Sequence, residues 1–246
     1  MEHNDILILP DIHGRHFWKT AVSNPENYRK IIFLGDYLDP YPWEEITLHE
    51  AFENFQSIVA FKEEHPDQVI LLLGNHDLHY VDKVYCDLAM STRYDYDHAA
   101  RNADFFHAHL PLFQLAYQTQ NGDRSFLFTH AGVTQLWYNQ HESVIGSLTA
   151  DHLNSLLLNN IRILADIGYY RGGYADSGSM VWADIDEMLN SAPIAGFYQI
   201  FGHTQQDTDD PIITSTMACL DCRRPFVLHD GNLSPLQSSS SSLSLS

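Results

Sequence analysis

The sequence predicts an α/β protein whose second half adds further β structure. Short apolar runs recur along the chain, each ended by glycine, proline or a carboxylate, and their length suits strands in a sheet that is covered on both faces. Helical patterns separate the early runs, so the expected order is βαβαβ, then helices, then more strands. The expected strands are ILIL (6–9), IIFL (31–34), VILLL (69–73), FLF (126–128) and YQIF (198–201).

The helices are expected from caps and apolar spacing. Thr47 and Glu50 match a capping box, which predicts a helix over 48–62. Leucines and isoleucines at helical spacing predict a second, amphipathic helix over 153–164. The segment 212–229 is typical of two strands joined by a turn. The end of the chain is therefore expected to return to β structure after a helical middle.

Composition predicts an acidic, solvated surface around a substantial core. The chain has 246 residues, of which 44% are hydrophobic, and a formal net charge of −19. This charge argues against holding duplex nucleic acid or an anionic membrane by bulk electrostatics, because both need a positive field. No segment approaches the ~20 consecutive apolar residues of a membrane span. We expect a single domain over 1–236 and a disordered Ser-rich tail over 237–246.

The cysteines indicate a reducing compartment. Cys86, Cys219 and Cys222 are too few, and odd in number, for a disulfide framework in a chain of this length. Cys219 and Cys222 form a lone C-x-x-C, whereas a zinc ribbon needs a second pair. No signal peptide is visible, because the first apolar run follows acidic rather than basic residues. We therefore expect a cytoplasmic protein.

Five predicted strands end in residues that bind metals or move protons. The residues after these runs are Asp11 and His13, Asp36 and Asp39, Asn75 and His76, His130, and His203. Since ligands in open α/β sheets bind beyond the carboxyl ends of the strands, these side chains are expected to lie together. Clustered carboxylates repel one another without a cation, and mixed oxygen and imidazole donors suit manganese, iron or zinc. The donors exceed what one ion needs and fit two divalent ions, about 3.5–4 Å apart, bridged by one carboxylate.

Together these motifs resemble the calcineurin-like metallophosphoesterases. The family pattern reads D-x-H, G-D-x-x-D, G-N-H-[DE], a histidine and G-H. The matching segments here are DIH (11–13), GDYLD (35–39), GNHD (74–77), His130 and GH (202–203). The resemblance implies a two-sheet β sandwich flanked by helices. The GHT form of the last motif and the segment SMVWAD are most similar to the branch of serine/threonine phosphatases and bacterial diadenosine tetraphosphatases.

The resemblance also implies a role for each of these residues. The first ion would be held by Asp11, His13 and Asp36. The second ion would be held by Asp36, as the bridge, with Asn75, His130 and His203. A bridging hydroxide would be the nucleophile, and manganese is the favoured metal. His76 would stay free of metal and protonate the leaving oxygen, Asp39 would orient it, and Asp77 would support the site without binding metal.

Two positions depart from the family pattern. Gln205 stands where many relatives have a last histidine ligand, and Pro40 stands where the phosphatase branch has a phosphate-binding arginine. Arg15, directly after DIHG, and Arg171, in a loop rich in glycine and tyrosine, are the candidates to bind phosphate instead, because a guanidinium matches phosphate geometry. For each of them, an ordinary surface arginine is the alternative. His79 is expected to have a surface or packing role.

The leading hypothesis is a dinuclear metal phosphatase that acts on a phosphomonoester, either a phosphoprotein or a small phosphorylated molecule. The alternative is a phosphodiesterase or dinucleoside polyphosphate hydrolase with the same metal centre. A non-catalytic binding module is less favoured, because the full ligand set, His76 and Asp39 are all present. The oligomeric state is left open by the sequence.

Overall fold

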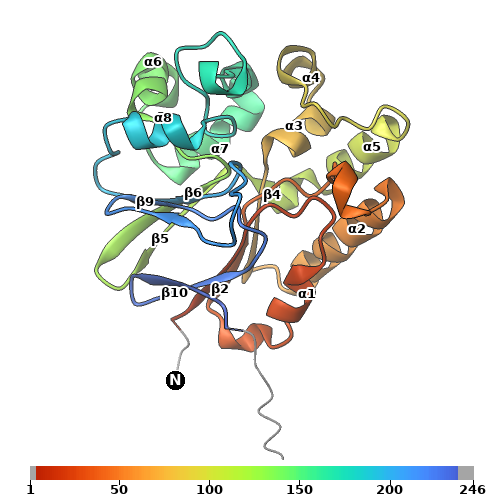
Figure 1. Ribbon diagram of the computed structural model, residues 1–246. Helices are drawn as coiled ribbons and strands as arrows, with labels where there is room; N and C mark the ends of the chain where they lie inside the picture. Colours follow the sequence, from red (N-terminus) through yellow and green to blue (C-terminus); the bar gives the residue numbers. More distant parts are fainter. Residues whose placement is uncertain (1–3, 238–246) are drawn as a thin grey trace, which may run out of the picture.

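A computed structural model describes residues 4–237 of the chain. Its strands form two sheets, one of six strands and one of five, with helices around them (Figure 1). The first sheet has the order β11 (Asn232–Pro235), β10 (Phe226–His229), β1 (Ile6–Leu9), β2 (Lys30–Phe33), β3 (Val69–Leu72) and β4 (Phe113–Gln114). The second sheet has the order β5 (Ala116–Asn121), β6 (Arg124–Thr129), β7 (Tyr198–Phe201), β9 (Met217–Cys219) and β8 (Ile212–Ile213).

The helices lie on the outer sides of the two sheets. Near the first sheet and along the right side of Figure 1 lie α1 (Phe17–Ala21), α2 (Leu48–Glu64), α3 (Asn75–Val81), α4 (Lys83–Ala89) and α5 (Ala99–His109). Above the second sheet lie α6 (Gln135–Ile145), α7 (Ala150–Asn159) and α8 (Ile185–Asn190). Among residues 4–237, no helix has the length and apolar character needed to cross a membrane.

Alternation along the central strands explains the layers. Ile6 and Ile8 of β1 share a buried cluster with Phe128 of β6, so this face of the first sheet packs against the second sheet. Leu7 points the other way and shares a cluster with Phe55 of α2. Both faces of β1 are therefore buried, which is why its four residues are all apolar. The two-sheet sandwich flanked by helices that the family resemblance implied is confirmed.

Parallel pairing brings the predicted site residues to one edge. In the first sheet, β1, β2 and β3 run parallel, and Ile8, Ile32 and Ile70 lie level with one another. In the second sheet, β6 and β7 are also parallel. The carboxyl ends of these strands carry the loops with the predicted ligands, so the topology gathers those loops at one end of the sandwich.

Most expected elements form, with two differences. The capping box is present, since Thr47 Oγ1 accepts the Glu50 N–H at 3.1 Å and Glu50 Oε2 accepts the Thr47 N–H at 2.8 Å. The helix predicted over 153–164 is wrong at its end: α7 stops at Asn159 and a 3-10 turn follows over Ile161–Ala165. The apolar spacing in the sequence continues past the end of α7, because the 3-10 turn that follows also buries an apolar residue, Leu164.

The C-terminal prediction of two strands around a turn is confirmed in part. The strands over 217–219 and 226–229 are present, but β9 belongs to the second sheet and β10 to the first. The turn between them crosses from one sheet to the other, and two short strands, β8 and β11, are added at the sheet edges. The expected tail lies outside the described residues except for Gln237, and the single-domain boundary stays a prediction.

Candidate metal centre and active site

The backbone is sharply bent where the predicted site residues leave their strands. Four of them have left-handed backbones: His13 (φ 42°), Asp36 (φ 54°), Asp39 (φ 57°) and His203 (φ 66°). Among the described residues only three other non-glycine positions have a positive φ. Such conformations cost free energy and concentrate at functional sites, where they aim side chains that a regular strand would point elsewhere.

Two glycines let carboxylates approach the backbone of neighbouring loops. A Cβ at Gly74 would lie 2.0 Å from Asp36 Oδ1, and a Cβ at Gly202 would lie 2.0 Å from Asp11 Oδ1. The space is used for hydrogen bonds, because Asp36 Oδ1 accepts the His76 N–H at 2.9 Å and Asp11 Oδ1 accepts the His203 N–H at 3.0 Å. Both carboxylates are thereby locked in place.

One group of donor atoms has the spacing of a metal shell. His130 Nε2 lies 3.1 Å from Asn75 Oδ1, 3.1 Å from His203 Nδ1 and 3.4 Å from Asp36 Oδ2. Donor atoms bound about 2.1 Å from one ion, at right angles or tetrahedrally, lie about 3.0–3.4 Å from one another. The ring of His130 is fixed by its Nδ1, which donates to the Leu34 carbonyl at 2.8 Å. These residues fit the predicted second metal site.

A second group contains His13 and the same carboxylate. His13 Nδ1 donates to the Leu38 carbonyl at 2.8 Å, and its Nε2 lies 3.4 Å from Asp36 Oδ2. The distance from Asp36 Oδ2 to His130 Nε2 is also 3.4 Å, so this one oxygen faces both groups equally. The third residue whose donor atom lies within 4.8 Å of these two is His76. Asp11, the third predicted ligand, is almost fully buried and held by the His203 N–H, but it does not share this close spacing.

The electrostatics of the cluster favour cations. Burial lowers the pKa of His13 and of His203 well below the usual histidine range, so both rings are neutral and offer lone pairs. Burial would also lower the pKa of His130, but the carboxylates of Asp36 and Asp11 outweigh it and raise that pKa to about 10. These carboxylates therefore attract positive charge to the centre of the cluster, which a divalent ion supplies.

His76 is held by a carboxylate. Its Nδ1 lies 2.8 Å from Asp39 Oδ2, which leaves Nε2 for the cavity. Asp39 also accepts the Tyr80 hydroxyl at 2.6 Å, and its Oδ2 lies 2.9 Å from Nε2 of His79. Burial would raise the pKa of Asp39, but the hydrogen bonds from His76 and His79 outweigh it and lower that pKa to about 2. Asp39 is therefore an anion at neutral pH and lies directly behind His76.

A cavity of about 190 Å³ opens onto these groups. It is lined by His13, Asp36, Tyr41, Asn75, His76, Ser91, Thr92, Arg93, Arg171, Trp182 and His203. Five of the eight residues predicted as metal ligands or catalytic residues reach its wall, and the others, Asp11, Asp39 and His130, are buried behind it. The structure therefore brings together all eight of these side chains.

Comparison with known proteins agrees with this geometry. A family model described as calcineurin-like phosphoesterase matches residues 5–207. The chain belongs to the calcineurin-like phosphoesterase family. The resemblance seen in the motifs is thereby confirmed.

The relatives found by sequence each match about a third of this chain. A probable serine/threonine-protein phosphatase of Encephalitozoon cuniculi is 32% identical over 83 residues, which cover 33% of this chain and 17% of the relative. The serine/threonine-protein phosphatase 4 catalytic subunit of Kluyveromyces lactis is 34% identical over 83 residues, which cover 32% of this chain and 25% of the relative. The match thus spans a quarter or less of these curated relatives.

A solved structure supports the fold over nearly the whole chain. The serine/threonine phosphatase of Saccharomyces cerevisiae described as similar to human phosphatase PP5 has a TM-score of 0.56 and 13% sequence identity. The match covers 97% of this chain and 81% of that one. At this identity the likeness concerns the arrangement of the strands and helices alone.

The two arginines predicted to bind phosphate, Arg15 and Arg171, differ in whether they reach the cavity. Arg15 is 8% exposed, and its Nε and a terminal nitrogen bind both carboxylate oxygens of Glu44 at 2.8–3.0 Å. It does not line the cavity, so it is neither a surface arginine nor free to meet a substrate in this geometry. Its role in substrate binding stays a prediction. Arg171 does line the cavity, where its Nε lies 2.7 Å from Asp184 Oδ2.

Sequence reasoning missed several residues at or beside the site, among them His79, Tyr41 and Arg93. His79 is buried against Asp39, and Tyr41 and Arg93 line the cavity. His79 had one available signal, because it follows His76 by three positions and α3 begins at Asn75, so the two rings share a helix face. Arg93 lies in an irregular segment between α4 and α5, where no sequence period indicates direction.

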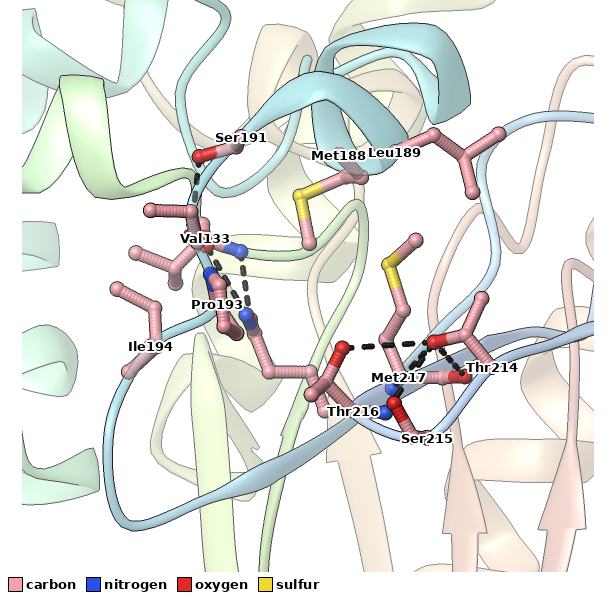
Figure 2. A pocket seen from close by; sticks show the side chains of 12 residues that line it. Val133, Met188, Leu189, Ser191, Pro193, Ile194, Thr214, Ser215, Thr216 and Met217 are labelled. Carbon is pink, nitrogen blue, oxygen red and sulfur yellow. Dashed lines mark hydrogen bonds between the residues drawn. The ribbon is translucent and has the colours of Figure 1, made fainter.

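A larger cavity lies elsewhere and has a different character. It measures about 300 Å³ and lies between α8 and the strands β7 and β9 (Figure 2). Its lining combines apolar side chains with uncharged polar ones, and none of its residues is titratable; the polar ones are Ser191, Gln199, Thr214, Ser215 and Thr216. Without an acid, a base or a metal ligand it offers no hydrolytic chemistry. The cavity of about 190 Å³ is the candidate active site because His13, Asp36, Asn75, His76 and His203 all line it.

Proposed function

We propose that this chain is a metal-dependent phosphoesterase that hydrolyses phosphomonoesters with two divalent ions. The observation that carries the proposal is Asp36 Oδ2, which lies 3.4 Å from Nε2 of His13 on one side and 3.4 Å from Nε2 of His130 on the other. A carboxylate between two groups of nitrogen and oxygen donors is suited to bridging paired ions. We favour manganese, with iron and zinc as the other metals that suit these donors.

Each ion is assigned its own residues. In this proposal the first ion would be held by Asp11, His13 and Asp36. The second ion would be held by Asp36, Asn75, His130 and His203. When bound, such ions supply Lewis acidity toward phosphoryl oxygens and make hydroxide available near neutral pH.

His76 supplies the proton. Its Nδ1 is occupied by Asp39 at 2.8 Å, so the proton given to the leaving oxygen resides on Nε2, which faces the cavity. The buried carboxylate of Asp39 fixes the plane of the ring and the direction of Nε2. A positioned general acid contributes most when the leaving group is a poor one, because such an oxygen cannot depart as an anion.

The charge of the cavity wall favours a monoester. Two guanidinium groups, those of Arg93 and Arg171, line the same cavity as the predicted metal ligands. A phosphomonoester brings two negative charges to such a site, whereas a diester brings one. The serine/threonine-protein phosphatase relatives support a phosphoprotein as substrate, and a small phosphorylated molecule is the other candidate.

Assays with two model substrates test this proposal. Protein stripped of metal and then loaded with manganese, iron or zinc is given p-nitrophenyl phosphate or bis(p-nitrophenyl) phosphate. We expect metal-dependent release of nitrophenol from the monoester, at the highest rate with manganese. Turnover of the diester alone would replace this proposal with a phosphodiesterase or dinucleoside polyphosphate hydrolase. No turnover with any metal would point to the binding module instead.

We further propose that residues 1–236 form one domain in a reducing compartment such as the cytoplasm. The domain proposal is supported by the first sheet, in which β10 and β11, late in the chain, pair beside β1. The location is supported by Cys86, Cys219 and Cys222, which are all free thiols. Limited proteolysis would test the first proposal, because a single domain yields one protected fragment.

A further inference from the structure

Arg93 reaches the cavity from outside the family motifs and is fixed by two contacts. Its Nε donates to the Asp39 carbonyl at 3.0 Å. Its guanidinium carbon lies 3.7 Å from the centre of the Tyr41 ring, which is close enough for a cation–π contact. A hydrogen bond and a stacked ring together fix the plane of the guanidinium, so little side-chain entropy remains to be lost when it binds a ligand.

A terminal nitrogen of the Arg93 guanidinium lies beside two histidines of the site. One terminal nitrogen lies 3.2 Å from His13 Nε2 and 3.3 Å from His76 Nε2. These are the nitrogens assigned above to a metal and to the leaving oxygen. A phosphoryl group located between those two nitrogens therefore lies within hydrogen-bonding reach of Arg93.

Arg93 differs from the two arginines near it in its charge partners. Arg15 is paired with Glu44 at 2.8 Å and Arg171 with Asp184 at 2.7 Å. Within residues 4–237, no carboxylate oxygen lies within 4.0 Å of the Arg93 guanidinium. In a chain of formal net charge −19, a fixed cation in the cavity without a carboxylate partner is suited to an anion from outside.

We propose that Arg93 binds the phosphoryl oxygens of the substrate and of the phosphate product. This inference rests on the proposed function, since it assigns a role within the same site. The planar guanidinium offers two parallel N–H groups, which match two oxygens of one phosphate. Because the same nitrogen lies next to His76 Nε2, Arg93 also directs the phosphoryl group so that its leaving oxygen faces the proton donor.

Binding of inorganic phosphate tests the proposal without turnover. Isothermal titration calorimetry is done on manganese-loaded wild type, Arg93→Met and Arg93→Lys, and metal content is measured in each sample. A lost charge-assisted contact is worth about 1.5–3 kcal/mol, so Arg93→Met is expected to bind phosphate roughly 10- to 100-fold more weakly. Arg93→Lys keeps the charge but loses the pair of parallel N–H groups, so an intermediate phosphate affinity is expected. Metal content is expected to stay at the wild-type level in both.

Arg101→Met is the matched control. The Arg101 guanidinium also stacks on an aromatic ring, 3.9 Å from the centre of Phe52, but it is not among the residues that line the cavity. This variant loses an arginine and a cation–π contact of the same kind, so phosphate affinity is expected to equal that of the wild type. An equal loss in both variants would mean a general effect on charge or folding and would overturn the proposal.

Three further outcomes overturn it. These are wild-type phosphate affinity in Arg93→Met, loss of metal in that variant, and absence of phosphate binding by the wild type. A wild type that binds phosphate through Arg93 and hydrolyses no monoester would reject the proposed function alone. Failure of the Arg93 proposal can therefore be distinguished from failure of the proposed function.

Discussion

The carboxylate of Asp77 accepts the backbone N–H of Asp36 at 2.7 Å through Oδ2. The same oxygen accepts the N–H of Gly74 at 2.8 Å, and Oδ1 accepts the N–H of Tyr37 at 2.9 Å. One fully buried side chain thus joins the loop after β2, which carries the bridging carboxylate, to the start of α3, which carries Asn75. Asp77 thereby holds the candidate ligands Asp36 and Asn75 in a fixed relation to each other.

Asp77→Asn is expected to destabilise the protein by about 1–3 kcal/mol, because the NH2 group that replaces one oxygen would face a backbone N–H and cannot accept a hydrogen bond from it. Metal content is expected to fall as well, since Asp36 loses its support. Denaturant unfolding and metal analysis check both. Asp82→Asn is the control, because Asp82 accepts a single N–H, from Tyr85, and asparagine caps a helix about as well as aspartate. Equal stability of the two variants would contradict the assigned role of Asp77.

His76→Asn is expected to keep its metal and lose activity. The rate with an alkyl phosphate, a poor leaving group, should fall about 10²- to 10⁴-fold, while p-nitrophenyl phosphate should lose less, because nitrophenolate departs without a proton. Steady-state kinetics with both substrates and metal analysis of the same samples make the measurement. An equal loss on both substrates, or a loss of metal, would mean that His76 is a ligand rather than the acid.

Asp36→Asn and His13→Ala are expected to lower metal content to different extents. Asp36 faces both donor groups at 3.4 Å, so its loss should reduce occupancy at both sites. His13 belongs to one group, so its removal should leave about one ion per chain of the two proposed. Metal analysis after exhaustive dialysis distinguishes them. Asp166→Asn, which removes a carboxylate paired with His141 outside the cluster, should retain both ions.

Asp39 is expected to make stability depend on pH in the acid range. Its pKa falls from 3.8 to about 2 on folding, so folding favours the charged form. The stabilisation is complete above the unfolded-state pKa of about 3.8 and is lost as the pH falls through about 2. The difference corresponds to about 2 kcal/mol. Unfolding curves of metal-free wild type and Asp39→Asn between pH 5 and 2 should therefore converge, and parallel curves would argue against an anionic Asp39.

Much of the metal centre was predictable because its signals are local. Each predicted ligand follows an apolar run closely, and β1, β3 and β7 begin where their runs do. Parallel pairing then brings those ends to one edge without further information. The structure differs from the prediction where packing, rather than the spacing of apolar residues, decides the backbone. At the end of α7, for example, a 3-10 turn replaces the predicted last turn of helix and still buries Leu164.

The sequence by itself determined the family and the candidates for metal binding and proton transfer, because these depend on motifs of a few residues at strand ends. Only the tertiary structure decided which charges are available. Arg15 directly follows a motif, but its charge is paired with Glu44. Arg93 is 54 positions from Asp39 in the sequence, yet it donates to the Asp39 carbonyl beside the cavity. The reason is physical: strand and helix periods specify the direction of a side chain within one element, but an irregular loop takes its direction from the surfaces it packs against.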